Sequence, residues 1–167
     1  TALVPNRDIG FELLGDVGSG RLSYAVGVFN GVGDGRSTAN VDFEDHREFA
    51  GRLFAQPFKG TSLTALQGLG FGLGGTWGNV SSNATGLASS YLTDGQQSFF
   101  TYTNSSVVAN GTHWRLSPQG YYYWGPFGLL GEYVISDQEV RKGATKADLQ
   151  NTAWQVTASY VLTGEES

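Results

Sequence analysis

The stretch Gly68–Gly78, GLGFGLGGTWG, places glycine at nearly every second position. Gly70, Gly72 and Gly75 satisfy the G-x-G-x-x-G pattern of dinucleotide-binding loops, which requires a helix directly after the glycines. No helical pattern follows, because Thr76–Gly78 continue the alternation. A period of two is typical of a β-strand, with large apolar residues on one face and small residues on the other. The stretch therefore predicts a strand rather than a phosphate-binding loop.

The same alternation recurs along the chain between clusters of turn residues. It predicts seven long strands, at about 7–17, 21–31, 46–57, 68–80, 112–124, 127–138 and 149–163. Tight turns at Gly18–Gly20 and Gly125–Pro126 alternate with longer connections, one of them a charged loop at Glu139–Asp148. We expect one all-β domain over 1–167, an antiparallel up-and-down meander with a long loop at about 81–111.

Two architectures fit this pattern: a transmembrane β-barrel and a soluble β-sandwich, the latter acting as a lectin-like binding module without catalysis. Sandwich strands average about 5–6 residues, whereas a tilted membrane strand needs about 9–11. Large aromatic residues also gather near the predicted strand ends, as at a membrane interface, namely Trp77, Trp114, Tyr122, Trp124 and Tyr160. These features favour the barrel, and the sandwich remains the alternative.

Composition excludes several other classes. The chain has 167 residues, a net charge of −5 and no cysteine, so nothing indicates nucleic-acid binding, a disulfide framework or a thiolate metal site. His46 and His113 lie far apart in sequence, and no serine occupies a G-x-S-x-G motif. We expect no enzymatic activity, no cofactor and no metal.

Several phrases resemble one known family. They are LVPNRDIGFELLG (Leu3–Gly15), AGRLFAQPF (Ala50–Phe58), GQQSFFTY (Gly95–Tyr102), RLSPQGYYYWGPFGLLGEYV (Arg115–Val134) and ASYVLTGE (Ala158–Glu165). In this order, and over nearly the whole chain, they are similar to the phosphate-selective porins of Gram-negative bacteria, the porin O and P family. The phrase at Arg115–Val134 is the most specific of them.

The resemblance implies a homotrimeric barrel of about 16 strands in the bacterial outer membrane, an even number as in other bacterial barrels. It also implies passive diffusion of small anions, plausibly phosphate or polyphosphate, through a water-filled lumen. The chain is less than half as long as a family member. Because an open sheet in lipid would leave backbone groups unpaired, we expect a fragment of a larger barrel.

The charged strand residues all fall on the face opposite the apolar one, which a barrel turns toward its lumen. They are Glu12, Glu48, Arg52, Arg115 and Glu132, and Gln119 shares their face. Arg52 and Arg115 fit an anion path, since guanidinium presents a planar, permanently charged fork to phosphate oxygens. The acids outnumber these arginines, so a wall of ion pairs without a role in selectivity is an equally good interpretation.

The long loop 81–111 is expected to fold into the lumen and narrow it, with Phe99, Phe100 and Tyr102 anchoring it to the wall. The alternatives are an extracellular cap, disorder, or an additional strand around 98–103. Glycine in a strand interior often marks close approach of another backbone. We therefore expect the loop to pack on the bare stripe formed by Gly70, Gly72 and Gly74.

Overall fold

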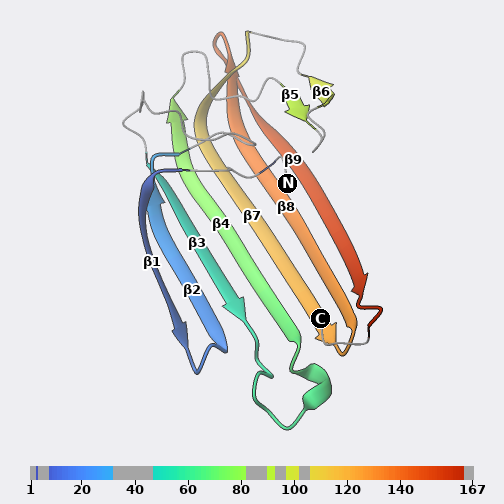
Figure 1. The fold of residues 1–167 in the computed structure, drawn as a ribbon. Coiled ribbons are helices and arrows are strands. Elements are labelled where there is room, and N and C mark those ends of the chain that lie inside the picture. Colours follow the sequence, from blue (N-terminus) through green and yellow to red (C-terminus); the bar gives the residue numbers. More distant parts are fainter. Residues whose placement is uncertain are drawn as a thin grey trace.

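The computed structural model describes Leu3 and residues 8–31, 47–81, 90–92, 97–101 and 106–163. Seven long strands form one antiparallel sheet in the order β1-β2-β3-β4-β7-β8-β9 (Figure 1). Their bounds are β1 Gly10–Val17, β2 Leu22–Phe29, β3 Glu48–Ala55, β4 Leu69–Ser81, β7 Val108–Trp124, β8 Phe127–Lys142 and β9 Thr145–Tyr160. The predicted meander of seven strands is confirmed, although β1, β2 and β3 have eight residues each and are shorter than predicted.

The stretch that satisfies the nucleotide-binding pattern lies in the middle of this sheet. β4 pairs with β3 on one side and with β7 on the other, and it runs through the glycines as regular strand. Each glycine there has a backbone conformation within the ordinary extended range, so the glycines do not form a turn. A phosphate-binding loop is thereby ruled out at this position.

The β1–β2, β3–β4 and β7–β8 connections lie at one end of the sheet, and the tight β8–β9 turn lies at the other (Figure 1). The β1–β2 turn places Gly18, Ser19 and Gly20 at positive φ, and the β7–β8 turn places Gly125 there. β3 and β4 are joined at the same end by a segment that carries a single 3-10 turn, η1 (Thr64–Leu66). Among the described residues, no helix is long and apolar enough to cross a membrane.

The expected charged loop at Glu139–Asp148 is wrong. β8 and β9 continue through these residues in regular register, with Glu139 opposite Asp148, and they turn tightly at Gly143, whose φ is +60°. The two strands therefore extend well beyond the part in which apolar and polar residues alternate. Charged side chains indicated exposure here, and exposure does not by itself end a strand.

A second, two-stranded sheet lies within the long connection between β4 and β7. It consists of β5 (Ser90–Leu92) and β6 (Ser98–Thr101). The strand around Ser98 that the sequence left open is thus present, but it pairs with β5 and does not join the seven-stranded sheet. All seven long strands belong to one sheet, so the described part of the chain is not a β-sandwich.

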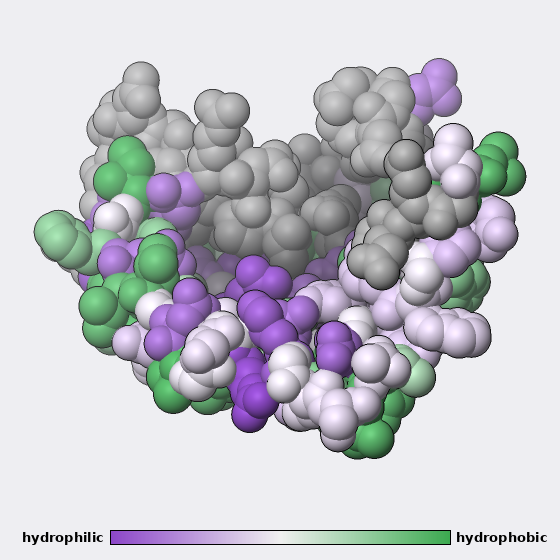
Figure 2. Space-filling model, turned by 60° about the horizontal axis from the view of Figure 1, so that its bottom comes forward, coloured by the Kyte–Doolittle hydropathy of each residue, from purple (hydrophilic) through white to green (hydrophobic). Residues whose placement is uncertain are grey.

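The sheet is curved into a trough, and hydrophilic residues gather along its hollow (Figure 2). Directly paired residues of neighbouring strands point to the same face. The register therefore assigns every strand residue to the concave or the convex face. One row on the convex face contains Leu13, Val26, Gly51, Gly75, Leu116, Ile135 and Thr152.

The convex face is apolar and uncovered. Phe11 exposes 88% of its surface and Trp154 exposes 74%, values far from those of a packed core. On the long strands, the apolar part of the convex face stops near one end of the sheet, where polar residues replace it. The next convex residue after Trp77 on β4 is Asn79, and the next after Ile135 on β8 is Asp137. The small hydrophobic core of the described residues lies on the concave face, where Leu3, Tyr91 and Val134 are buried together.

Candidate functional site on the concave face

The concave face brings together all the charged candidates of the sequence analysis. One register row contains Glu12, Gly27, Ala50, Thr76, Arg115, Ser136 and Asn151. Neighbouring rows add Arg52 with Gly74 and Ser117, and Gln119 with Glu132 and Gln155. The predicted separation of charged and apolar faces is therefore confirmed for these residues.

The glycines of β4 form a floor over which side chains of β3 and β7 meet. Phe54 of β3 and Tyr121 of β7 stack with ring centroids 5.3 Å apart. A Cβ atom on Gly70 would lie 2.7 Å from the Tyr121 ring, and one on Gly72 would lie 2.8 Å from Phe54 and 2.6 Å from Gln119. The close approach expected at these glycines is therefore real, but its source is different from the one expected.

The long loop does not account for the close contacts at Gly70 and Gly72. Among the described residues, the nearest atoms there belong to neighbouring strands, and the space above Gly74 holds no described atom closer than two backbone oxygens at 3.9 Å. Phe54 and Gln119 are on strands directly next to β4, so their side chains cross no other strand to reach these glycines. Most of the loop that was expected to pack on this stripe, residues 82–89, 93–96 and 102–105, lies outside the described residues, so its packing there stays a prediction.

At the other end of β4, an ion pair crosses the same strand. Arg115 donates from Nη1 to Glu48 Oε1 at 2.5 Å and to Thr76 Oγ1 at 3.1 Å. Both partners are nearly buried, with 3% and 11% of their side chains exposed. Gly78 is the β4 residue opposite Glu48, and a Cβ there would lie 3.1 Å from the Glu48 Cα. Arg115 is thus neutralised and held within the wall.

Arg52 has a different environment. Its side chain is exposed on the concave face, and its guanidinium carbon lies 5.4 Å from the centre of the Phe54 ring. Among the described residues it forms no ion pair. Of the two predicted anion contacts, Arg52 is therefore the one whose charge faces open space.

The other acids do not bind the arginines as expected. Glu132 accepts hydrogen bonds from Ser117 Oγ at 3.0 Å and from Gln155 Nε2 at 2.8 Å. Glu12 is exposed on β1 and forms no ion pair with a described residue. Of the ion pairs predicted between the concave acids and the two arginines, only Glu48 with Arg115 is present in the described part of the chain.

A buried polar cluster that the sequence did not indicate adjoins Arg115. The imidazole Nε2 of His113 lies 3.2 Å from Ser136 Oγ, and both side chains are almost fully buried, as is Gln138. His113 and Ser136 are far apart in sequence, so only the register of β7 with β8 brings them together. Strand parity alone would have placed His113 on the face of Arg115.

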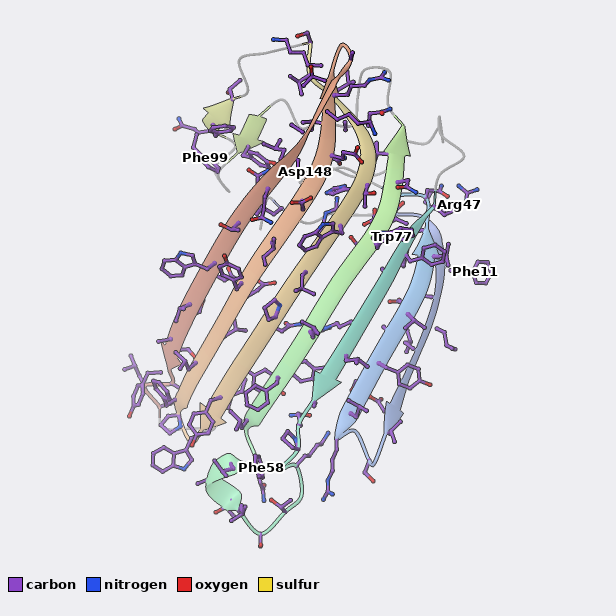
Figure 3. The ribbon with its side chains drawn as sticks, turned by 180° about the vertical axis from the view of Figure 1, so that it is seen from behind. Phe11, Arg47, Phe58, Trp77, Phe99 and Asp148 are labelled. Carbon is purple, nitrogen blue, oxygen red and sulfur yellow. The ribbon has the colours of Figure 1, made fainter. Side chains whose placement is uncertain are left out.

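The long loop does reach the concave face, through a residue that was not predicted. Tyr91 is buried against Val134, and its hydroxyl accepts a hydrogen bond from Asn151 Nδ2 at 3.3 Å. Of the expected anchors, Phe99 is 66% exposed (Figure 3), and Phe100 is 47% exposed and packs beside Tyr91 with the ring centroids 6.1 Å apart. Tyr102 lies outside the described residues.

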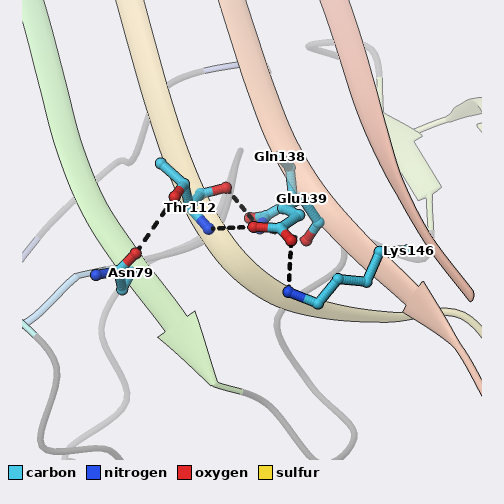
Figure 4. Close-up of polar contacts among 5 residues, drawn as sticks. All are labelled: Asn79, Thr112, Gln138, Glu139 and Lys146. Carbon is cyan, nitrogen blue, oxygen red and sulfur yellow. Dashed lines mark hydrogen bonds and ion pairs between the residues drawn. The ribbon is translucent and has the colours of Figure 1, made fainter. Parts of the chain in front are cut away.

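The rim beyond the apolar part of β8 carries a compact polar network (Figure 4). Glu139 accepts hydrogen bonds from Lys146 Nζ at 2.6 Å and from the backbone N–H of Thr112 at 3.1 Å. These donors lower the pKa of the Glu139 carboxyl, the Lys146 ammonium contributing most. Gly111 in the adjoining bulge has a φ of +129°, and a Cβ there would overlap the Glu139 carboxylate.

No group of histidine and acidic residues with the geometry of a metal site occurs among the described residues. Comparisons with protein-family models, with curated proteins and with solved structures find no match for this chain. The chemistry that the site supports must therefore be argued from its geometry. It offers one exposed guanidinium, a row of aromatic rings and several hydrogen-bonding side chains in a water-accessible trough.

Proposed function

We propose that this chain forms part of the wall of an outer-membrane porin of a Gram-negative bacterium, through which small anions such as phosphate diffuse passively. The observation that carries the proposal is the contrast between the two faces of one curved sheet. The convex face is apolar and exposed, whereas the concave face holds the charges and hydrogen-bonding groups. Transmembrane barrels show this arrangement, with lipid outside and water inside.

The length of the apolar convex segments supports the same proposal. On β7 they run from Trp114 to Trp124 and on β8 from Phe127 to Ile135, which is the length of about 9–11 residues that a tilted strand needs to cross a bilayer. Trp114 and Trp124 delimit the β7 segment, as interfacial aromatic residues do. A soluble protein would have to cover this surface, and no described residue does so.

Two edges of the sheet support the idea of a larger barrel. β1 and β9 each pair with one neighbour only, and their outer backbone groups need partners if the sheet lies in lipid. Further strands of a complete barrel would provide these partners. The resemblance to the porin O and P family supports a homotrimer in which each subunit closes its own barrel.

The charges of this wall bear on selectivity. Arg115 is paired with Glu48, and the concave face also carries Glu12, Asp16 and Glu132, so Arg52 is the principal anion contact in this segment. Weak contacts at several such groups let an ion exchange its hydration shell and still leave. The anion preference rests on the resemblance, and this wall by itself contributes only modestly to it.

Conductance across a planar lipid bilayer tests the proposal. The full-length protein should form open channels whose reversal potential in a salt gradient is biased toward anions, and added phosphate should reduce the chloride current. Cation-selective channels would contradict the anion pathway. Absence of channels from protein that has folded in detergent would contradict the porin itself.

A further inference from the structure

A row of aromatic side chains interrupts the polar concave face. Phe54 stacks on Tyr121, and Tyr121 packs at 5.0 Å from Tyr123, with the rings inclined by 49°. All three side chains lie on the water-lining side of the sheet, where polar residues would be expected. A passive pathway for inorganic anions does not require them.

Arg52 lies at the end of this row. Its guanidinium is exposed, has no ion pair with a described residue and sits 5.4 Å from the Phe54 ring centre. Beside it a cavity of about 230 Å³ opens over Gly74, with Phe29 and Ser117 also in its lining. The cavity exists because Gly74 has no side chain, while Arg52 and Ser117 flank it on the neighbouring strands.

We propose that this part of the concave face binds small aromatic carboxylates, with the carboxylate on Arg52 and the ring against Phe54 and Tyr121. Guanidinium binds a carboxylate through two parallel hydrogen bonds, and aromatic rings favour offset stacking at about 4.5–7 Å. The guanidinium carbon of Arg52 lies 5.4 Å from the Phe54 ring centre, so a charged group and an aromatic group are within reach of one small ligand. The inference rests on the proposed function, because it names a class of solute for the same lumen.

The charges of the site favour a monovalent organic anion over phosphate. Glu132 and Glu12 lie on the same face as Arg52, and their repulsion grows with the charge of the ligand. Glu132 accepts its hydrogen bonds from the neutral donors Ser117 and Gln155, so neither of these partners is a cation. A singly charged carboxylate is attracted to Arg52 less strongly than phosphate is, and stacking of its aromatic ring compensates for this difference.

Equilibrium binding to the full chain folded in detergent micelles tests this inference without the need for channels. Saturation-transfer NMR should show contact with the ring protons of benzoate at pH 7, where it is ionised, and a weaker signal from cyclohexanecarboxylate. Micelles without protein provide the control for partition into detergent. Equal binding of benzoate, cyclohexanecarboxylate and acetate would overturn the inference.

Two substitutions localise the site. Phe54→Leu should raise the dissociation constant for benzoate about three- to tenfold, the worth of one aromatic pair, with no change for acetate. Arg52→Gln should weaken both ligands. The control Phe71→Leu changes the same residue type on the convex face of β4 and should leave both dissociation constants as they were. If Phe71→Leu weakens benzoate binding as much as Phe54→Leu does, the site is not on the concave face.

Bilayer currents separate this inference from the proposed function. Channels that benzoate blocks no better than acetate would refute the aromatic site and leave the porin intact. A chain that binds benzoate but forms no channels would refute the porin and leave the site intact.

Discussion

Two glycines on the same face of β4, two residues apart, should respond in opposite ways to the same substitution. A Cβ on Gly72 would lie 2.6 Å from Gln119 and 2.8 Å from the Phe54 ring, whereas a Cβ on Gly74 would have no atom of a described residue closer than 3.9 Å. Both are in regular strand without positive φ. The pair therefore isolates the effect of the side chains that cross over β4.

The expected sizes follow from these distances. At Gly74, alanine restricts the unfolded chain and should raise the free energy of unfolding by about 0.4–1 kcal/mol. At Gly72 the same gain is outweighed, because the Phe54 ring must move off Tyr121 and overpacking costs about 1–3 kcal/mol. We expect Gly72→Ala to be less stable than Gly74→Ala by about 2 kcal/mol.

Guanidinium unfolding of the protein in micelles, followed by tryptophan fluorescence, measures this difference. The two variants should share the same denaturant dependence, so that their midpoints report stability directly. Equal midpoints would refute the conclusion that Phe54, Gln119 and Tyr121 occupy the space above the glycines. A lower midpoint for Gly74→Ala than for Gly72→Ala would indicate that the long loop covers Gly74.

Three further predictions concern the polar groups. Arg115→Met should lower the free energy of unfolding by about 3 kcal/mol, since it leaves Glu48 buried without its cation; adding Glu48→Gln should restore part of the loss in the same denaturation assay, and a double variant as unstable as the single one would argue against the pair. The contribution of Glu139 to the free energy of unfolding should be fully present above the ordinary pKa of a glutamate and be lost as the pH falls through its lowered folded pKa. Glu139→Gln should therefore flatten the acid side of a plot of unfolding free energy against pH. An unchanged slope would contradict this assignment. Gly111→Ala should destabilise the rim by about 1–3 kcal/mol, because the residue has positive φ and abuts the Glu139 carboxylate; Gly131→Ala, where a Cβ meets no atom within 4 Å, is the matched control, and equal thermal stability of the two variants would contradict the prediction.

The sheet could be predicted largely from the sequence because period-two alternation is strong in this chain. Leu69, Phe71 and Leu73 alternate with glycine so regularly that their faces follow from parity alone, and the structure has the same assignment. The end of β8 could not be predicted in this way. Beyond Ile135 the convex face becomes polar, so alternation disappears although the hydrogen-bonded ladder continues to Lys142.

The contacts of the site were less predictable, since they depend on pairing between distant strands. Arg115 was a candidate from its charge, but its partner Glu48 is 67 residues away and meets it only across β4. Tyr91 and His113 were missed for the same reason. Their partners are on β8 and β9, and neither a motif nor local spacing indicates them.

Contact of one face of this sheet with lipid, and of the other with water, can be tested residue by residue. The chain contains no cysteine, so single cysteines carrying a nitroxide label can be placed along β3, β4 and β7 in protein reconstituted into vesicles. Labels at Leu53, Leu73 and Leu116 should collide mainly with oxygen dissolved in the bilayer, and labels at Arg52, Gly74 and Ser117 mainly with a water-soluble nickel chelate. Equal access of the nickel chelate to both sets of positions would contradict the claim.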